Sequence, residues 1–87
     1  MAETLRYNLI FRPEPEGGFT VIVPSLPGCV TCGKNLKEAK EMAHDAIEGY
    51  LYSLKKHKEL IPSDIDNFVT TIDIETKKQF SRKLAYA

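Results

Sequence analysis

The chain has 87 residues, of which 43% are hydrophobic and 28% are charged. This length suits one small domain, and the composition is that of a folded globular protein rather than a disordered one. Its apolar runs are too short to cross a bilayer, and the N-terminus leads into a strand-like pattern without a secretory leader. We therefore expect a cytoplasmic protein that makes no membrane contact.

The net charge is zero, but the charges are unevenly distributed along the chain. Residues 1–75 contain twelve acidic and eight basic side chains, a net charge of −4, whereas residues 76–87 contain four basic side chains and no acidic one. We expect one domain over residues 1–75 and a short basic C-terminal tail over residues 76–87. An acidic domain favours a basic partner, although the same distribution is equally typical of an ordinary solvated surface.

Three short strands are predicted in the first third of the chain. Apolar residues alternate with polar ones over residues 5–11 and again over 19–23, which is the period of a strand with one buried face. Gly17-Gly18, between these segments, supplies residues that tolerate the positive φ angles of a hairpin turn. The proline- and glycine-rich segment 24–28 then predicts a tight turn before a third strand at about 29–33.

A long helix is predicted after the third strand. Asn35 is a suitable N-cap, and Glu38 can complete a capping box three residues later. From Leu36 to Leu54, apolar residues recur every three or four positions and form one stripe along the helix. The lysines at the C-terminal end suit the negative pole of the helix dipole.

A fourth strand is predicted at about 67–74, which gives the order β-β-β-α-β. This is an α+β fold, with a mainly antiparallel sheet and one helix on one face. Because crossover connections are almost always right-handed, we expect the last strand beside the first and parallel to it. The single helix leaves the other face of the sheet open, where Ile10, Ile22 and Val69 form an apolar surface for a partner or a second copy.

No pattern in the sequence indicates catalysis. Cys29 and Cys32 have the spacing of a metal or redox pair, but a zinc site needs two further ligands and a redox cysteine needs a helix N-terminus. His44 has no nucleophile beside it, and the predicted strand interiors lack the carboxylates of a two-metal nuclease. We expect a protein that is not an enzyme, with no catalytic residue, no bound metal and no cofactor.

The segment from Val23 to Gly33, which reads VPSLPGCVTCG, resembles the signature of the HicB-like antitoxins. The resemblance continues in Leu36-Lys37-Glu38-Ala39 at the helix start, in Gly17-Gly18-Phe19, and in Ile61-Pro62 after the helix. It covers roughly residues 5–74. It implies a partial ribonuclease-H-like sheet without the catalytic carboxylates of that fold.

The same resemblance implies a partner, a HicA-like toxin. Such a toxin is a small basic ribonuclease with a double-stranded-RNA-binding fold that cleaves mRNA with a histidine, and the antitoxin covers that histidine. Many family members also carry a C-terminal DNA-binding domain. Only about thirteen residues follow the predicted fourth strand here, so we expect no DNA-binding domain and no direct operator binding.

For partner binding we expect the proline-rich turn and the open sheet face, that is, Ile10, Ile22, Pro24, Leu26, Pro27, Gly28, Cys29 and Val69. We also expect a homodimer or a tetramer, since the same surfaces suit self-association. Two alternatives remain open at this point. One is a standalone oligomeric binding protein with another partner. The other is an RNA-binding protein that uses the basic tail, which the acidic domain would oppose.

Overall fold

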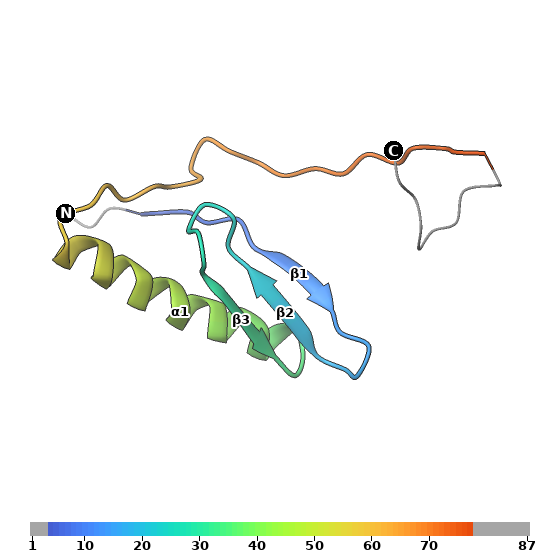
Figure 1. Cartoon of the computed structure of the whole chain (residues 1–87), viewed down its shortest axis with the longest axis horizontal. Coiled ribbons are helices and arrows are strands. Elements are labelled where there is room, and N and C mark those ends of the chain that lie inside the picture. The colour runs from blue at the N-terminus through green and yellow to red at the C-terminus, as the bar shows by residue number, and fades with distance from the viewer. Residues whose placement is uncertain (1–3, 78–87) are drawn as a thin grey trace.

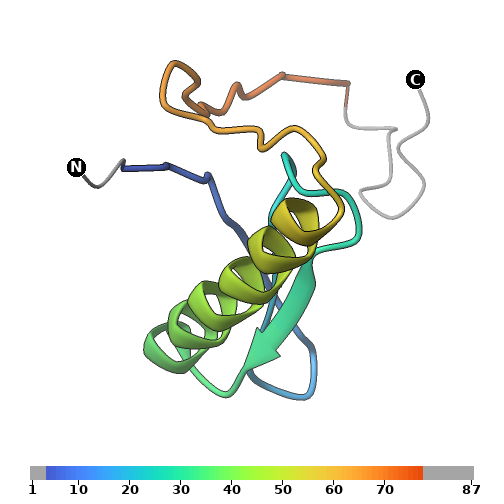
Figure 2. The ribbon, with the colours of Figure 1, turned by 90° about the vertical axis from the view of Figure 1, so that its left-hand side faces the viewer.

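The computed structural model describes residues 4–77 and contains a three-stranded sheet and one helix. The elements are β1 (Ile10–Pro13), β2 (Phe19–Ile22), β3 (Val30–Gly33) and α1 (Leu36–Lys56). The strands form an antiparallel meander in the order β1-β2-β3, and α1 lies across one face of it (Figures 1 and 2). The predicted α+β class and the order β-β-β-α are confirmed. Between residues 4 and 77, no helix has the length and apolar character needed to cross a membrane.

A tight turn connects β1 to β2, as the sequence predicts. The backbone N–H of Glu14 donates to the carbonyl of Gly18, and that of Gly17 donates to the carbonyl of Glu14, both at 3.0 Å. Gly17 and Gly18 have φ angles of 107° and 82°, a region that side chains rarely allow. The glycine pair therefore sets the hairpin, which in turn fixes the register of β1 against β2.

The N-terminus of α1 has the predicted capping box. The Asn35 side chain accepts a hydrogen bond from the backbone N–H of Glu38 at 2.8 Å. The Glu38 carboxylate reaches back and accepts from the backbone N–H of Lys34, one residue before the cap, at 2.9 Å. Because two backbone donors are satisfied at once, the helix start is held firmly beside the end of β3.

The core lies between α1 and the sheet and consists of two clusters. In the first, Val21 of β2 packs against Ala39 and Ala43 of the helix. The second contains Val23, Leu26 and Cys29, which lie beneath the C-terminal half of α1. The small alanine side chains allow the helix backbone to approach the sheet closely, and that approach places the turn after β2 under the far end of the helix.

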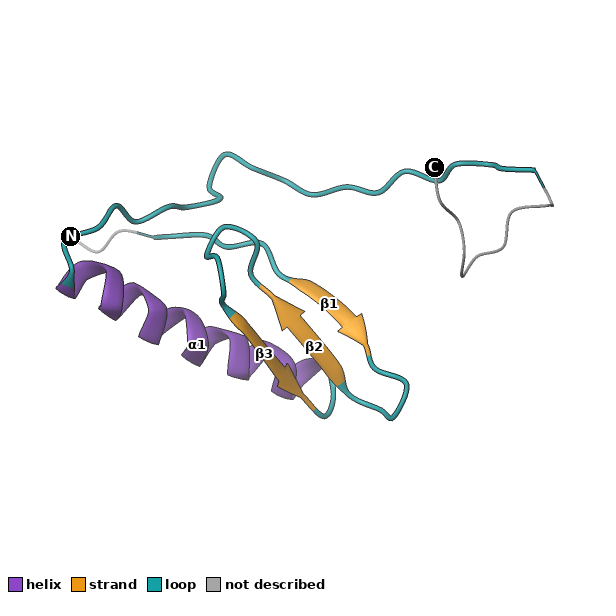
Figure 3. Cartoon of the chain, viewed as in Figure 1, coloured by secondary structure: helices purple, strands orange, loops and turns teal. Residues whose placement is uncertain are grey.

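The predicted fourth strand is absent from the described residues, because the segment 67–74 forms neither helix nor strand (Figure 3). The chain after α1 does contact the segment before β1: the backbone N–H of Asp64 donates to the carbonyl of Arg6 at 2.7 Å. The N–H of Asn8, however, donates to the Asp64 side chain at 2.9 Å instead of to a backbone carbonyl. The Asp64 carbonyl accepts from Asn67 at 2.9 Å in a turn that directs the chain away.

The predicted position of the last strand beside the first is therefore not confirmed: residues 63–64 contact the segment before β1, and residues 67–74 form no strand. The ribonuclease-H-like arrangement depends on the missing strand and is not confirmed. Most of the predicted basic tail, residues 78–87, lies outside the described residues.

Candidate partner interface

The turn between β2 and β3, residues 24–28, is closed by three backbone hydrogen bonds. The N–H of Val23 donates to the carbonyl of Cys29 at 3.0 Å, and the N–H of Cys29 donates to that of Leu26 at 2.9 Å. The third runs from the N–H of Leu26 to the carbonyl of Val23 at 3.1 Å. Gly28 has a φ of 83°, so the turn depends on a residue that tolerates the left-handed region. We call residues 24–28 the β2–β3 turn.

The predicted contact residues of this turn separate into two groups. Leu26 and Cys29 are buried, with 0% and 5% of their surface exposed, and they belong to the core. Pro24, Pro27 and Gly28 are exposed. The three exposed residues are therefore available to a partner, whereas the two buried ones hold the turn in place.

Asp64 fixes the β2–β3 turn to two other parts of the chain. It is the buried charged residue of the described chain, with 2% of its surface exposed. Its carboxylate accepts hydrogen bonds from the backbone N–H of Asn8, the Ser25 hydroxyl and the Asn67 side-chain amide. These three donors hold the pKa of Asp64 below its usual range, with the Asn8 bond as the largest cause. We call Asp64 with its three donors the Asp64 cluster.

Two tyrosines add to this attachment. The Tyr50 hydroxyl of α1 donates to the carbonyl of Pro27 at 2.8 Å. The Tyr7 hydroxyl donates to the carbonyl of Pro62, and its pKa is raised by burial and, to a lesser extent, by the nearby Asp64 charge. The turn is thus attached both to the helix and to the segment that follows the helix. Hydrogen bonds of this number favour a single conformation of the turn.

The sheet face opposite α1 carries an apolar row that crosses all three strands. Ile10 pairs with Ile22, and Ile22 pairs with Val30, so the three side chains are direct cross-strand neighbours. Ile10 is 44% exposed and Val30 is 55% exposed. We call Ile10, Ile22 and Val30 the sheet-face row. Val69, which was expected on this face, is 63% exposed in the segment 67–74 and does not lie on the sheet.

Sequence reasoning found Ile10 and Ile22 but missed Val30 and Asp64. Val30 could have been found, because the two-residue period of a strand places it on the face opposite Thr31. Two of the three donors to Asp64 lie 39 and 56 residues away along the chain, so no local pattern marks Asp64 as a link between these segments.

The two cysteines have different surroundings. Cys29 is buried and Cys32 is exposed, and both are free thiols. Burial raises the pKa of Cys29, which disfavours the reactive thiolate. Cys29 is therefore a packing residue of the core, whereas Cys32 lies on the surface.

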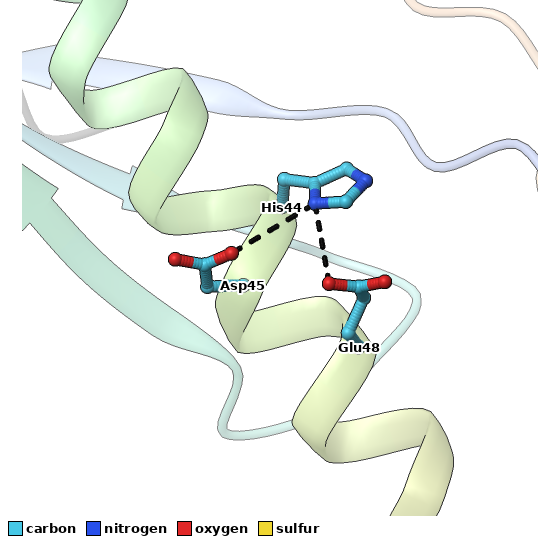
Figure 4. Close-up of side chains that lie close together, drawn as sticks. All are labelled: His44, Asp45 and Glu48. Carbon is cyan, nitrogen blue, oxygen red and sulfur yellow. Dashed lines mark ion pairs between the residues drawn. The ribbon is translucent and has the colours of Figure 1, made fainter.

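His44 lies on the exposed surface of α1 beside two carboxylates (Figure 4). Its Nδ1 atom is 3.4 Å from the Glu48 carboxylate and 3.9 Å from that of Asp45. One ligand atom from each residue lies within 4.8 Å of the others, a spacing that a metal ion can bridge. All three side chains are exposed, however, and an ordinary surface contact between helix positions i and i+4 accounts for the arrangement.

Comparison with known proteins identifies similar chains. A family model described as the HicB-like antitoxin of a bacterial toxin–antitoxin system matches residues 7–82. The chain is 47% identical over 60 residues to a UPF0150 protein of Thermoplasma acidophilum, an alignment that covers 69% of this chain and 87% of that protein. It is 40% identical over 55 residues to a UPF0150 protein of Archaeoglobus fulgidus, with 63% of this chain and 78% of that protein covered.

The chain is also similar to proteins that are named antitoxins. It is 36% identical over 58 residues to antitoxin HicB of Escherichia coli strain K12. That alignment covers 67% of this chain and 42% of the antitoxin. The chain therefore matches most of the length of the UPF0150 proteins but less than half of the longer antitoxin.

Proposed function

The chain belongs to the HicB-like antitoxin family, and from this premise we propose that it binds and masks a small mRNA-cleaving toxin of the HicA-like type. We propose that it acts in the cytoplasm as a binding protein and not as an enzyme. The observation that carries this proposal is the open sheet face with its apolar row, which offers a partner a surface of three neighbouring side chains.

The geometry of this face suits tight recognition. Beside the sheet-face row, Arg12, Thr20 and Cys32 of the same strands form a second cross-strand row. Arg12 and Thr20 thus offer polar contacts next to the apolar side chains, as protein interfaces commonly do. The β2–β3 turn is held by backbone bonds and by the Asp64 cluster, so little conformational entropy is lost when a partner binds it.

The charge of the domain supports a basic partner. Residues 1–75 carry a net charge of −4, and electrostatic complementarity accelerates encounter with a basic protein. We propose that this role does not involve operator DNA through the described residues, since they contain one helix and a helix-turn-helix needs two. We further propose that the functional unit is a homodimer or a tetramer.

Co-expression tests the antitoxin role. The test pairs the chain with a small basic HicA-like protein from an adjacent reading frame, and if the proposal holds we expect the wild-type chain to restore growth and to co-purify with it. The variant Val30→Arg, at an exposed position of the sheet-face row, should lose both properties while its circular dichroism stays native. The matched control is Tyr52→Arg, because Tyr52 is 70% exposed on α1.

If the wild-type chain neither restores growth nor co-purifies with this toxin, the antitoxin proposal fails. The alternative of a standalone oligomeric binding protein would then be favoured. Equal loss of rescue in the Val30 and Tyr52 variants would instead show that the sheet face is not the specific contact surface.

A further inference from the structure

The segment that follows the Asp64 cluster, residues 67–74, is apolar and exposed. Four large side chains project into solvent, with exposed fractions of 86% for Phe68, 63% for Val69, 82% for Ile72 and 71% for Ile74. The segment is rich in β-branched and aromatic residues, which favour strand formation. A contiguous exposed apolar segment of this kind usually marks a surface that binds a partner.

The same molecule has an open strand edge. In the described chain β1 pairs with β2 alone, so one of its two edges has no strand partner. The N–H of Glu14 donates to the carbonyl of Gly18, and backbone groups two residues apart in a strand point to the same side, so those of Arg12 and Ile10 also face β2. The backbone groups of Phe11 therefore face the open edge. Those of Arg6 and Asn8, in the segment before β1, bond to residues 63–64.

An apolar groove lies under this edge, between the N-terminal segment and α1. Its volume is about 300 Å³, and its apolar walls are formed by Leu5, Leu9, Ile47 and Leu51. A strand added to the edge of β1 presents alternate side chains toward the helix, and these would fill the groove. The edge and the groove together therefore fit a strand that is apolar on one face, with residues such as Phe68, Ile72 and Ile74 two and four positions apart.

The turn at Asp64 keeps the chain's own segment away from this edge. The Asp64 carboxylate occupies the N–H of Asn8, and the Asp64 carbonyl is bonded to Asn67, so the strand pairing stops after one residue. Beyond the turn, the segment extends away from its own sheet (Figures 1 and 2). The chain thus holds both an unfilled edge and an unpaired strand-like segment, and a second copy supplies the missing partner for each.

We propose that two copies of this chain exchange residues 67–74, so that the segment of each copy pairs as a parallel strand with the free edge of β1 in the other. When a twofold axis relates the two exchanged strands, the assembly is closed. Each open edge of β1 and each segment 67–74 then has a partner. In a register that places Val69 beside Ile10, Phe68 lies over the groove and Val69 extends the sheet-face row. This inference concerns assembly alone and does not depend on the toxin partner.

The molar mass of the full chain in solution, measured by light scattering after size-exclusion chromatography, tests the exchange. We expect twice the chain mass of 9.8 kDa for the wild type. The double variant Phe68→Asp/Ile72→Asp should have the mass of one chain with an unchanged far-ultraviolet spectrum, since both side chains are exposed in the single chain. The control Tyr52→Asp should remain dimeric. A monomeric wild type, or a double variant that stays dimeric, would overturn the proposal.

A disulfide test separates exchange from closure onto the chain's own sheet. The double variant Arg12→Cys/Thr71→Cys, made with Cys32→Ser, places one thiol on β1 and one on the segment. Mild oxidation should give a covalent dimer on a non-reducing gel if the segment pairs with the second copy. An oxidised band with the mass of one chain would show that the segment pairs with its own β1, and the exchange would be refuted. Because neither experiment includes the toxin, its outcome is independent of the co-expression result.

Discussion

Asp64 joins three segments that are far apart in the sequence. Its carboxylate accepts hydrogen bonds from Asn8 in the segment before β1, from Ser25 in the β2–β3 turn and from Asn67 in the turn that follows Asp64. A carboxylate with 2% exposure is stable in a protein only when its oxygens are hydrogen-bonded, and here donors reach both oxygens. The residue therefore contributes to the fold and to the rigidity of the proposed contact surface at once.

Replacement of Asp64 by alanine should destabilise the domain. The change leaves three donors without an acceptor, and an unsatisfied buried donor costs about 1–3 kcal/mol. We expect the free energy of unfolding in urea to fall by at least about 2 kcal/mol. Asp66→Ala is the matched control, because Asp66 is exposed and two residues away. Equal losses in the two variants would contradict the role assigned to Asp64.

The stability of the domain should depend on pH through Asp64. Its pKa is lower in the folded chain than in the unfolded chain, so the unfolded state binds more protons in the acid range. The contribution of the carboxylate is fully present above the unfolded pKa of about 3.9 and is lost as the pH falls through the lower folded value. Urea unfolding from pH 7 to pH 3 should show a smaller decrease for Asp64→Asn than for the wild type. Parallel curves would exclude this linkage.

At the scale of elements, the close contact between α1 and β3 requires glycine, which has no side chain, at position 33. A Cβ atom at Gly33 would lie 2.3 Å from the backbone nitrogen of Ala39 and 2.5 Å from its Cα atom. These are backbone atoms of the first helical turn, so they cannot move aside without displacing the helix. Gly33 thus allows the helix to begin directly against the strand that precedes it.

Alanine substitutions at two glycines should have opposite effects. Gly33→Ala should lower the free energy of unfolding by about 1–3 kcal/mol or more, because inserted atoms in a packed contact force backbone shifts. Gly49→Ala, within α1, should raise it by about 0.5–1 kcal/mol, since nothing lies within 4 Å of the added Cβ and alanine favours helix. Thermal melting measures both changes. A Gly33 variant as stable as the wild type would show that the helix can shift freely.

Elements with local signals could be predicted from the sequence. The cap at Asn35, the glycine pair of the hairpin and the apolar stripe of α1 each act within a few residues, and all are present in the structure. The segment 67–74 has the composition of a strand, but pairing beside β1 is interrupted at Asp64 by distant partners. For the same reason the signature motif alone could not distinguish the buried Leu26 from the exposed Pro27.

At the scale of the whole molecule, the net negative charge of residues 1–75 should control how fast the proposed toxin is captured. Complementary net charges raise the association rate mainly at low salt, because the Debye length falls from about 30 Å at 0.01 M to about 8 Å at 0.15 M. We expect the association rate constant with the basic HicA-like partner to decrease several-fold over this range, with a smaller change in the dissociation rate constant. Surface plasmon resonance at a series of salt concentrations measures both. An association rate constant that does not depend on salt concentration would show that net charge does not contribute to recognition.

The bonds at Asp64 also have a consequence for the order in which the chain folds. The β1–β2 hairpin, the β2–β3 turn and α1 each form from neighbouring residues, whereas the bond from Asn8 to Asp64 spans 56 residues. Closure of so long a loop carries an entropic cost that only an already assembled sheet and helix can offset. We therefore expect the Asp64 contacts to form after the folding transition state. Loss of this carboxylate should accelerate unfolding and leave the refolding rate nearly unchanged, and it should thus shorten the lifetime of the native state without slowing its formation.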